Sequence, residues 1–304
     1  MTLVHAHDAA HAGDRDVHKR RLRAVLALSL VFLVIEIVGG IASGSLALLA
    51  DATHLFADVA ALMLAYGAMT FAEFVPTKKY TFGFHRAEIL AAFVNAELLL
   101  LVTAFLFYAA YQRLLDPPEI TSGLMTAVAL AGLGANVASV ALLREASMHS
   151  LNLKAAYLEV LSDALGALGV AVAAVVISFS GWFWIDPLVS AGIGCLVLPR
   201  TLSLLRQSAH ILLEGTPREV DLTVVRERLL ALPGVVELHD LHFWTLTSGV
   251  HSATVHIRAA DESPRGAVLQ AVQRLLKDAA GIDHSTVQVE WGNETTCTTT
   301  ADHA

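Results

Sequence analysis

Six long apolar stretches constrain this chain more than any other feature of its sequence. A helix that spans a bilayer needs about 20 mostly apolar residues. The segments that meet this requirement are 24–44, 46–71, 88–111, 121–143, 155–179 and 185–204. Hydrophobic residues make up 55% of the chain and charged residues only 16%, whereas a soluble domain carries about 25% charged residues. The sequence therefore predicts an all-helical membrane bundle of six spans.

The basic residues between these stretches predict how the bundle is oriented. Lys and Arg gather before the first span, in alternate loops and after the sixth span, at Lys19, Arg20, Arg21, Arg23, Lys78, Lys79, Arg86, Arg144, Lys154 and Arg206. The opposite loops carry only Arg113. Short cytoplasmic loops are enriched in Lys and Arg, so we expect a multi-pass protein of the cell (inner) membrane with both termini in the cytoplasm.

After residue 206 the pattern becomes that of a small soluble domain. Helical spacing and strand-like alternation follow one another in the order αββαβ, over Leu222–Leu232, Val235–Thr245, Ser252–Arg258, Ala267–Ala279 and Thr286–Trp291. This order favours an α+β layer of two helices on one sheet. We expect four parts: a disordered tail (1–17), a transmembrane domain (18–206), a cytoplasmic domain (207–292) and a second disordered tail (293–304).

Two of the apolar stretches carry paired side chains of the kinds that bind metals. His54 and Asp58 in the second stretch are four residues apart, as are Glu159 and Asp163 in the fifth, so each pair shares one helix face. Ionisable groups inside a span are costly and commonly functional. Four nitrogen and oxygen ligands suit a tetrahedral, zinc-like site. Asp51, near the start of the second stretch, is expected to cap that helix or to support the ligands.

These pairs also predict an exchange of metal for protons. Three carboxylates and one imidazole can carry up to three negative charges, which a dication would largely neutralise. Without a metal such buried carboxylates take up protons, and metal binding displaces protons from its ligands. The same residues can therefore hold metal and protons alternately.

Other features exclude several classes of protein. The net charge of −8 argues against a nucleic-acid partner, and the two cysteines form no CxxC motif. A catalytic metal site needs an open coordination position and a general base, but no HExxH motif is present. We therefore do not expect an enzyme.

Motifs that run along nearly the whole chain point to one family. They are Gly39-Gly40, residues 43–47, 51–58, 80–88 and 152–166, Asp186-Pro187, and residues 213–217 and 239–247. With these motifs the chain resembles the cation diffusion facilitator family, of the bacterial zinc, cadmium and cobalt efflux type. The resemblance implies a homodimer of six-span protomers in the bilayer, each with a cytoplasmic ferredoxin-like domain, that exports zinc in exchange for protons by alternating access.

The resemblance also implies which residues form the transport site. His54, Asp58 and Asp163 match the family ligands, whereas zinc-type relatives usually have histidine at the position of Glu159. A carboxylate there favours oxygen-loving ions such as Mn²⁺ or Fe²⁺, while the imidazole of His54 favours Zn²⁺, Co²⁺ or Cd²⁺. We expect zinc export; the alternatives are a manganese- or iron(II)-selective exporter and a membrane-anchored metal sensor.

A second set of metal ligands is implied in the cytoplasmic domain, either regulatory or structural. His239 and His256 match family ligands on adjacent strands, and Glu290 on the last strand is a third candidate. His284 and Cys297 could form a further cluster there. The alternative is that the histidines of this domain are exposed to solvent and bind no metal. The histidines of the N-terminal tail either capture ions or have no role: His5, His7, His11 and His18.

Overall fold

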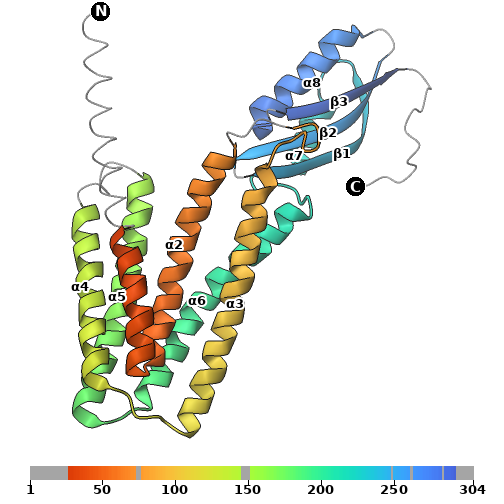
Figure 1. The fold of residues 1–304 in the computed structure, drawn as a ribbon. Helices are drawn as coiled ribbons and strands as arrows, with labels where there is room; N and C mark the ends of the chain where they lie inside the picture. The colour runs from red at the N-terminus through yellow and green to blue at the C-terminus, as the bar shows by residue number, and fades with distance from the viewer. Residues whose placement is uncertain are drawn as a thin grey trace, which may run out of the picture. The chain divides into compact units, whose positions relative to one another are not determined.

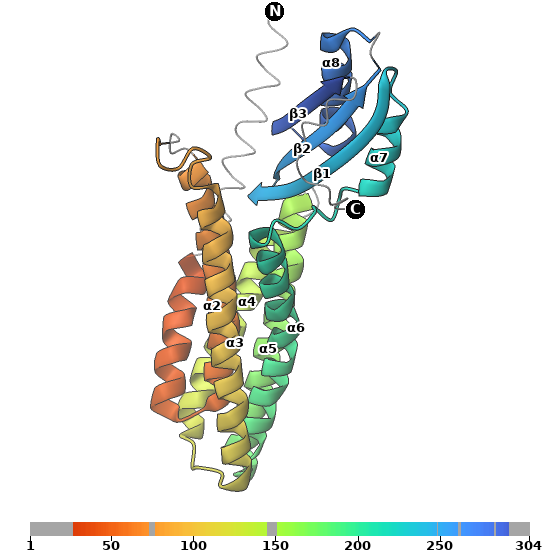
Figure 2. The ribbon, with the colours of Figure 1, turned by 90° about the vertical axis from the view of Figure 1, so that its right-hand side faces the viewer.

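The structure, a computed structural model, describes residues 27–72, 77–144, 151–247, 249–260, 263–282 and 284–291. The chain divides into two compact units. One comprises residues 1–64 and 94–203, and the other comprises residues 65–93 and 204–304. Figures 1 and 2 show the ribbon from two sides.

The first unit consists mainly of long helices, three of which (α2, α3 and α6) extend into the residues of the second unit. In chain order these are a helix over Ala27–Ser43, then α2 (Leu46–Ala72), α3 (His85–Leu115), α4 (Ser122–Arg144), α5 (Leu151–Ser180) and α6 (Ile185–Leu212). Each overlaps one of the predicted stretches, although α6 continues well past residue 204. Among the described residues, four helices are long and apolar enough to cross a membrane: α3, α4, α5 over Val160–Ser180, and α6. The Ala27–Ser43 helix is apolar but shorter, so six spans stay a prediction.

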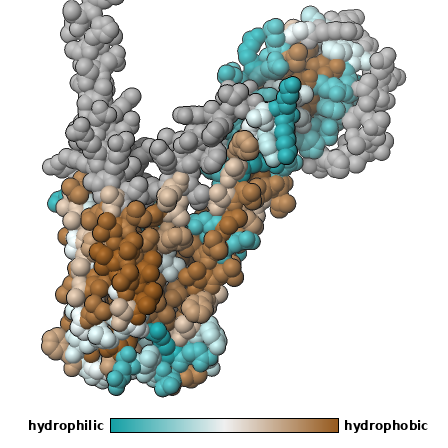
Figure 3. Space-filling model, in the orientation of Figure 1, coloured by the Kyte–Doolittle hydropathy of each residue, from teal (hydrophilic) through white to brown (hydrophobic). Residues whose placement is uncertain are grey.

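The outer surface of these helices is strongly apolar. Large side chains point outward, including Ile41 at 69% exposure, Phe105 at 65% and Leu196 at 76%. Figure 3 shows hydrophobic residues over much of the visible face of the bundle. Extended apolar patches are rare on soluble monomers, and outward-facing side chains of this kind suit contact with lipid.

Small residues let the helices pack closely inside the bundle. A Cβ atom on Gly39 would lie 2.7 Å from Cγ2 of Val128, so the Ala27–Ser43 helix approaches α4 too closely for a side chain there. Close approach at small residues is the usual way in which helices associate in a membrane. The family motif Gly39-Gly40 therefore has a packing role.

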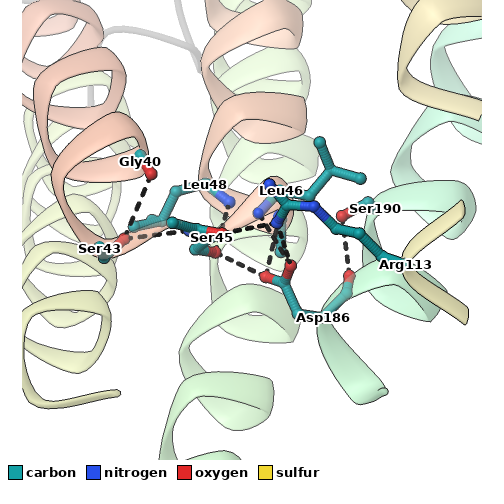
Figure 4. Close-up of polar contacts among 10 residues, drawn as sticks. Gly40, Ser43, Ser45, Leu46, Leu48, Arg113, Asp186 and Ser190 are labelled. Carbon is teal, nitrogen blue, oxygen red and sulfur yellow. Dashed lines mark hydrogen bonds and ion pairs between the residues drawn. The ribbon is translucent and has the colours of Figure 1, made fainter. Parts of the chain in front are cut away.

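A buried carboxylate at the start of α6 caps the start of α2 (Figure 4). Asp186 is fully buried and accepts hydrogen bonds from Ser45 Oγ at 2.6 Å, from the Leu46 amide at 2.8 Å and from the Ala47 amide at 3.0 Å. Arg113 Nη1 of α3 lies 3.4 Å from the same carboxylate. Asp186 thus binds the free amides that every helix N-terminus presents.

Of the two roles expected for Asp51, that of a cap on α2 was wrong, and support of the ligands stays a prediction. No acidic residue lies in the first turn of α2, because Asp51 comes five residues after Leu46. Capping requires an acceptor at or before the first turn. Asp186 supplies this acceptor from a distant part of the sequence. The capping role therefore could not be predicted from the motif Asp186-Pro187 alone.

The second unit contains a three-stranded sheet with two helices. Its elements are α7 (Leu222–Leu230), β1 (Val235–Thr247), β2 (Val250–Ala259), α8 (Arg265–Ala280) and β3 (His284–Trp291). The strand order is β1-β2-β3, with β1 antiparallel to β2 and β2 parallel to β3. The order of elements is the predicted αββαβ, with each strand somewhat longer than expected.

One face of this sheet forms the core of the domain. Leu229 of α7 and Val272 of α8 are fully buried with Val255 and Ile257 of β2. Because side chains alternate between the two faces of a strand, the residues next to these, such as His256, lie on the opposite face. The end of β1 also contacts the first turn of α3, where Thr247 Oγ1 donates a hydrogen bond to Glu88.

Candidate metal centres

Three of the predicted transport ligands meet inside the helical bundle. One ligand atom from each of His54, Asp58 and Asp163 lies within 4.8 Å of the other two. His54 Nε2 is 3.1 Å from Asp163 Oδ1, and the two side chains are 21% and 13% exposed. Distances of this order let three side chains close on one cation after small rotamer changes. The arrangement joins α2 to α5, the two helices whose sequences carry the paired ligand-type side chains.

The fourth predicted ligand, Glu159, belongs to α5, but its side chain lies outside the described residues. Glu159 and Asp163 are one helical turn apart, so residues at these positions share a face of α5. Its part in the site remains a prediction.

A basic residue that the sequence analysis overlooked contacts this cluster. Arg200 Nη1 of α6 lies 3.0 Å from Asp58 Oδ1. A single arginine within the apolar sixth stretch was the available signal, because an intramembrane charge is rare and normally paired. The cluster therefore involves three helices, α2, α5 and α6.

Two further buried carboxylates lie where glycine leaves room for them. Glu36 is 3% exposed, and a Cβ atom on Gly132 of α4 would lie 2.9 Å from its Oε1. Asp51 is 9% exposed, and a Cβ atom on Gly166 of α5 would lie 3.8 Å from its Oδ1. The bundle interior thus holds acidic side chains beyond the ligand cluster.

The second candidate centre lies on the sheet face opposite α7 and α8. His239 of β1 pairs with His256 of β2 in register. Glu290 of β3 pairs with Arg258, two residues along β2 from His256. Residues two apart on a strand point to the same side, so the alternation alone brings His256 and Glu290 to one face.

The distances within this group suit a metal ion. His239 Nε2 lies 3.5 Å from Glu290 Oε2, and His256 Nδ1 lies 3.8 Å from Glu290 Oε1. One ligand atom from each residue lies within 4.8 Å of the others. The buried Nδ1 atoms of both histidines have no hydrogen-bond partner among the described residues. Buried polar atoms normally have one, so these nitrogens fit metal ligation.

Asp240 is a neighbour of this group that sequence reasoning missed. Its backbone has a φ of 53° at the register shift between His239 and His242, a conformation in which Asp is one of the tolerated residues. Its Oδ2 lies 3.6 Å from His256 Nε2 and its Oδ1 lies 2.8 Å from His242 Nε2. The bulge turns a carboxylate toward the histidines, which strict alternation would not predict.

His284, also predicted as a ligand, does not join the group. It is the first residue of β3 and pairs with Ser252, four positions along β2 from His256. At about 3.3 Å per residue this separates the two levels by roughly 13 Å. Its ring instead makes an edge contact with Phe82, at 5.6 Å between centroids. Its expected partner Cys297 and the N-terminal histidines lie outside the described residues.

Comparison with known proteins places nearly the whole chain in one family. Residues 22–213 match the cation efflux transmembrane domain, and residues 217–291 match the cytoplasmic domain of cation efflux proteins. The metal cation efflux system protein CzcD of Cupriavidus metallidurans is 46% identical over 291 residues, which are 95% of this chain and 90% of that protein.

Two further relatives are similar over most of their length. The zinc transporter ZitB of Pectobacterium atrosepticum is 39% identical over 291 residues, 95% of this chain and 89% of that protein. A cadmium, cobalt and zinc/H(+)-K(+) antiporter of Bacillus velezensis is 36% identical over 293 residues, 93% and 91% respectively. Together with the apolar helices and the motifs along the sequence, these matches establish that the chain is a multi-pass membrane protein of the cation diffusion facilitator family.

Proposed function

We propose that this protein exports divalent transition-metal ions, zinc foremost, from the cytoplasm in exchange for protons. The observation that carries the proposal is the cluster of His54, Asp58 and Asp163 between membrane helices, with ligand atoms within 4.8 Å of one another. Nitrogen and oxygen ligands in this number suit zinc and similar ions. Relatives over nearly the full chain are named as transporters of zinc and of cadmium, cobalt and zinc.

Glu159 completes the transport site in this proposal as a fourth ligand. With it, the site has one imidazole and three carboxylates. Zn²⁺, Cd²⁺ and Co²⁺ are the proposed substrates because His54 supplies a nitrogen donor. Protons occupy the same ligands when metal leaves, because metal binding and proton binding compete for them. This competition is the basis of the proposed antiport, with the site facing each side of the membrane in turn.

The proposed architecture is a homodimer in the inner membrane. Each protomer has six spans over residues 18–206 and a ferredoxin-like cytoplasmic domain over residues 207–292, with both termini cytoplasmic and residues 1–17 and 293–304 as tails. The alternation of basic loops supports this orientation. The αββαβ order, with both helices on one sheet face, supports the ferredoxin-like assignment.

The cytoplasmic domain holds a second metal site in this proposal, formed by His239, His256 and Glu290. Their ligand atoms are close enough to share an ion, and Asp240 lies within reach of His256. A metal bound there would neutralise Glu290, which is only 7% exposed, and would join all three strands of the sheet. Such an ion would stabilise the domain or report the cytoplasmic metal concentration to the transporter.

Metal uptake into proteoliposomes tests the proposal directly. The wild type would be offered Zn²⁺, Cd²⁺, Co²⁺, Mn²⁺ and Fe²⁺ with a pH-sensitive dye inside the vesicles. We expect zinc uptake with opposed proton movement, and its loss in Asp163→Asn. Asp116→Asn, an equivalent change at an exposed residue before α4, is the matched control and should transport normally. Zinc uptake at the wild-type rate in Asp163→Asn would refute the shared site.

The same assay separates the alternatives. Glu159 favours harder ions, so a manganese- or iron(II)-selective exporter predicts uptake of those ions first, with preference moving toward zinc in Glu159→His. A membrane-anchored sensor predicts no flux of any metal, with binding only at the cytoplasmic domain.

A further inference from the structure

An arginine of α6 contacts one of the proposed ligands of the membrane site. Arg200 Nη1 lies 3.0 Å from Asp58 Oδ1, and the two side chains are 52% and 13% exposed. Guanidinium stays protonated in proteins, so this charge cannot be removed by deprotonation. Arg200 comes 15 residues after Ile185 at the start of α6, about 22 Å along a helix. This is far from the Asp186 end of the helix and within reach of the ligands on α2.

Every described ligand of the site has a polar or charged partner. His54 pairs with Asp163 at 3.1 Å, and Asp58 pairs with Arg200 at 3.0 Å. A metal ion held by all three ligands needs Asp58 as a donor, and it would bring two positive charges beside the guanidinium. Charges of like sign repel strongly where water is scarce. Metal and Arg200 therefore compete for Asp58.

The Arg200 side chain can move away from Asp58 when a metal ion binds. Its side chain is long and more than half exposed, whereas Asp58 is largely buried, so the arginine can withdraw while the carboxylate stays. It follows Pro199, which lies inside α6. A proline within a helix removes one backbone hydrogen bond and permits bending, which loosens the helix beside Arg200.

We propose that Arg200 is an exchangeable counter-ion of the transport site: it neutralises Asp58 in the metal-free state and is displaced by the incoming dication. This inference rests on the proposed function, because it treats His54, Asp58 and Asp163 as ligands. The arginine holds the Asp58 carboxylate in position, and its competition weakens metal binding. Weaker binding favours release on the far side of the membrane, so Arg200 sets the balance between affinity and turnover.

Zinc binding to the full-length chain in detergent tests this role. Titration calorimetry would compare the wild type with Arg200→Gln and Arg200→Lys, and the binding component that Asp58→Asn removes defines the membrane site. Loss of the ion pair with the largely buried Asp58 implies that Arg200→Gln tightens this component roughly 10- to 100-fold. Arg200→Lys keeps the charge and should stay within about threefold of the wild type. Arg206→Gln removes an exposed arginine farther along α6 and should change nothing.

Transport kinetics give a second test, because a purely structural role of Arg200 would not change KM and kcat together. Tighter binding without the competitor should lower both KM and kcat in Arg200→Gln, while Arg200→Lys restores both. In the Asp58→Asn background, where the membrane-site component is absent, Arg200→Gln should leave the remaining zinc-binding component unchanged. Should Arg200→Gln not fold, Arg200→Met carries the same expectation with a side chain suited to an apolar site.

Unchanged or weaker zinc binding in a folded Arg200→Gln protein would overturn the proposal, since Arg200 would then only hold α6 against α2. A different result would overturn the proposed function itself: Asp58→Asn would bind zinc in the same way as the wild type. The two failures are thus distinguishable in one experiment.

Discussion

Replacing Asp186 by asparagine should destabilise the helical bundle far more than an isosteric change normally does. The carboxylate accepts from Ser45 Oγ at 2.6 Å and from the amides of Leu46 and Ala47 at 2.8 and 3.0 Å, and it faces Arg113. All these partners are donors. Whichever way the asparagine amide turns, its NH₂ group would confront a donor that Asp186 now satisfies.

The magnitude follows from the bonds that are lost. At least one charge-assisted hydrogen bond disappears, at about 1.5–3 kcal/mol, and Arg113 loses its counter-charge. Breaking a buried ion pair from one side costs about 3–5 kcal/mol. We expect the free energy of unfolding to fall by about 3–5 kcal/mol, and the thermal midpoint to fall by about 6–20 °C by the scaling known for domains of moderate size.

Thermal unfolding of the full chain in detergent, followed by circular dichroism at the helix band, would measure the change. Asp116→Asn makes the same chemical substitution at an exposed residue and should leave the midpoint unaltered. Ser45→Ala should give a smaller loss, about 1–2 kcal/mol, because Ser45 Oγ donates to Asp186 and accepts from the Leu48 amide. An Asp186→Asn midpoint within about 2 °C of the wild type would show that solvent or lipid, rather than this carboxylate, satisfies the start of α2.

Two other substitutions test the packing and the cytoplasmic centre. Gly39→Ala should cost about 1–3 kcal/mol of stability, because its Cβ would lie 2.7 Å from Val128; Gly123→Ala, with nothing within 4 Å, should be neutral in the same melting assay. His256→Ala should remove one zinc-binding component from the calorimetric titration and leave the component assigned to Asp58 intact. His284→Ala should change neither component, because His284 lies away from the cluster, and an equal loss in both histidine variants would contradict the proposed cytoplasmic site.

Much of the architecture could be read from local patterns. Hydrophobic length indicated each long helix, because a span must bury its backbone over about 20 residues. Spacing of four placed His54 and Asp58 on one face of α2, as helix geometry requires. Alternation of apolar and polar residues in β1 and β2 indicated that both are strands. These features depend on neighbours in the sequence, so they need no knowledge of the tertiary fold.

Contacts between distant segments could not be read in this way. Asp186 caps α2 from 140 residues away, Arg200 reaches Asp58 from another helix, and a bulge turns Asp240 toward His256 while the strand register carries His284 away. Each depends on which helix faces meet, on the axial offset between helices, or on the register between strands. Those quantities are set by side-chain packing across elements, as at Gly39 against Val128, and hydrophobic periodicity does not encode them. The sequence by itself therefore determined which residue types line each element, and only the tertiary structure decided which of them meet.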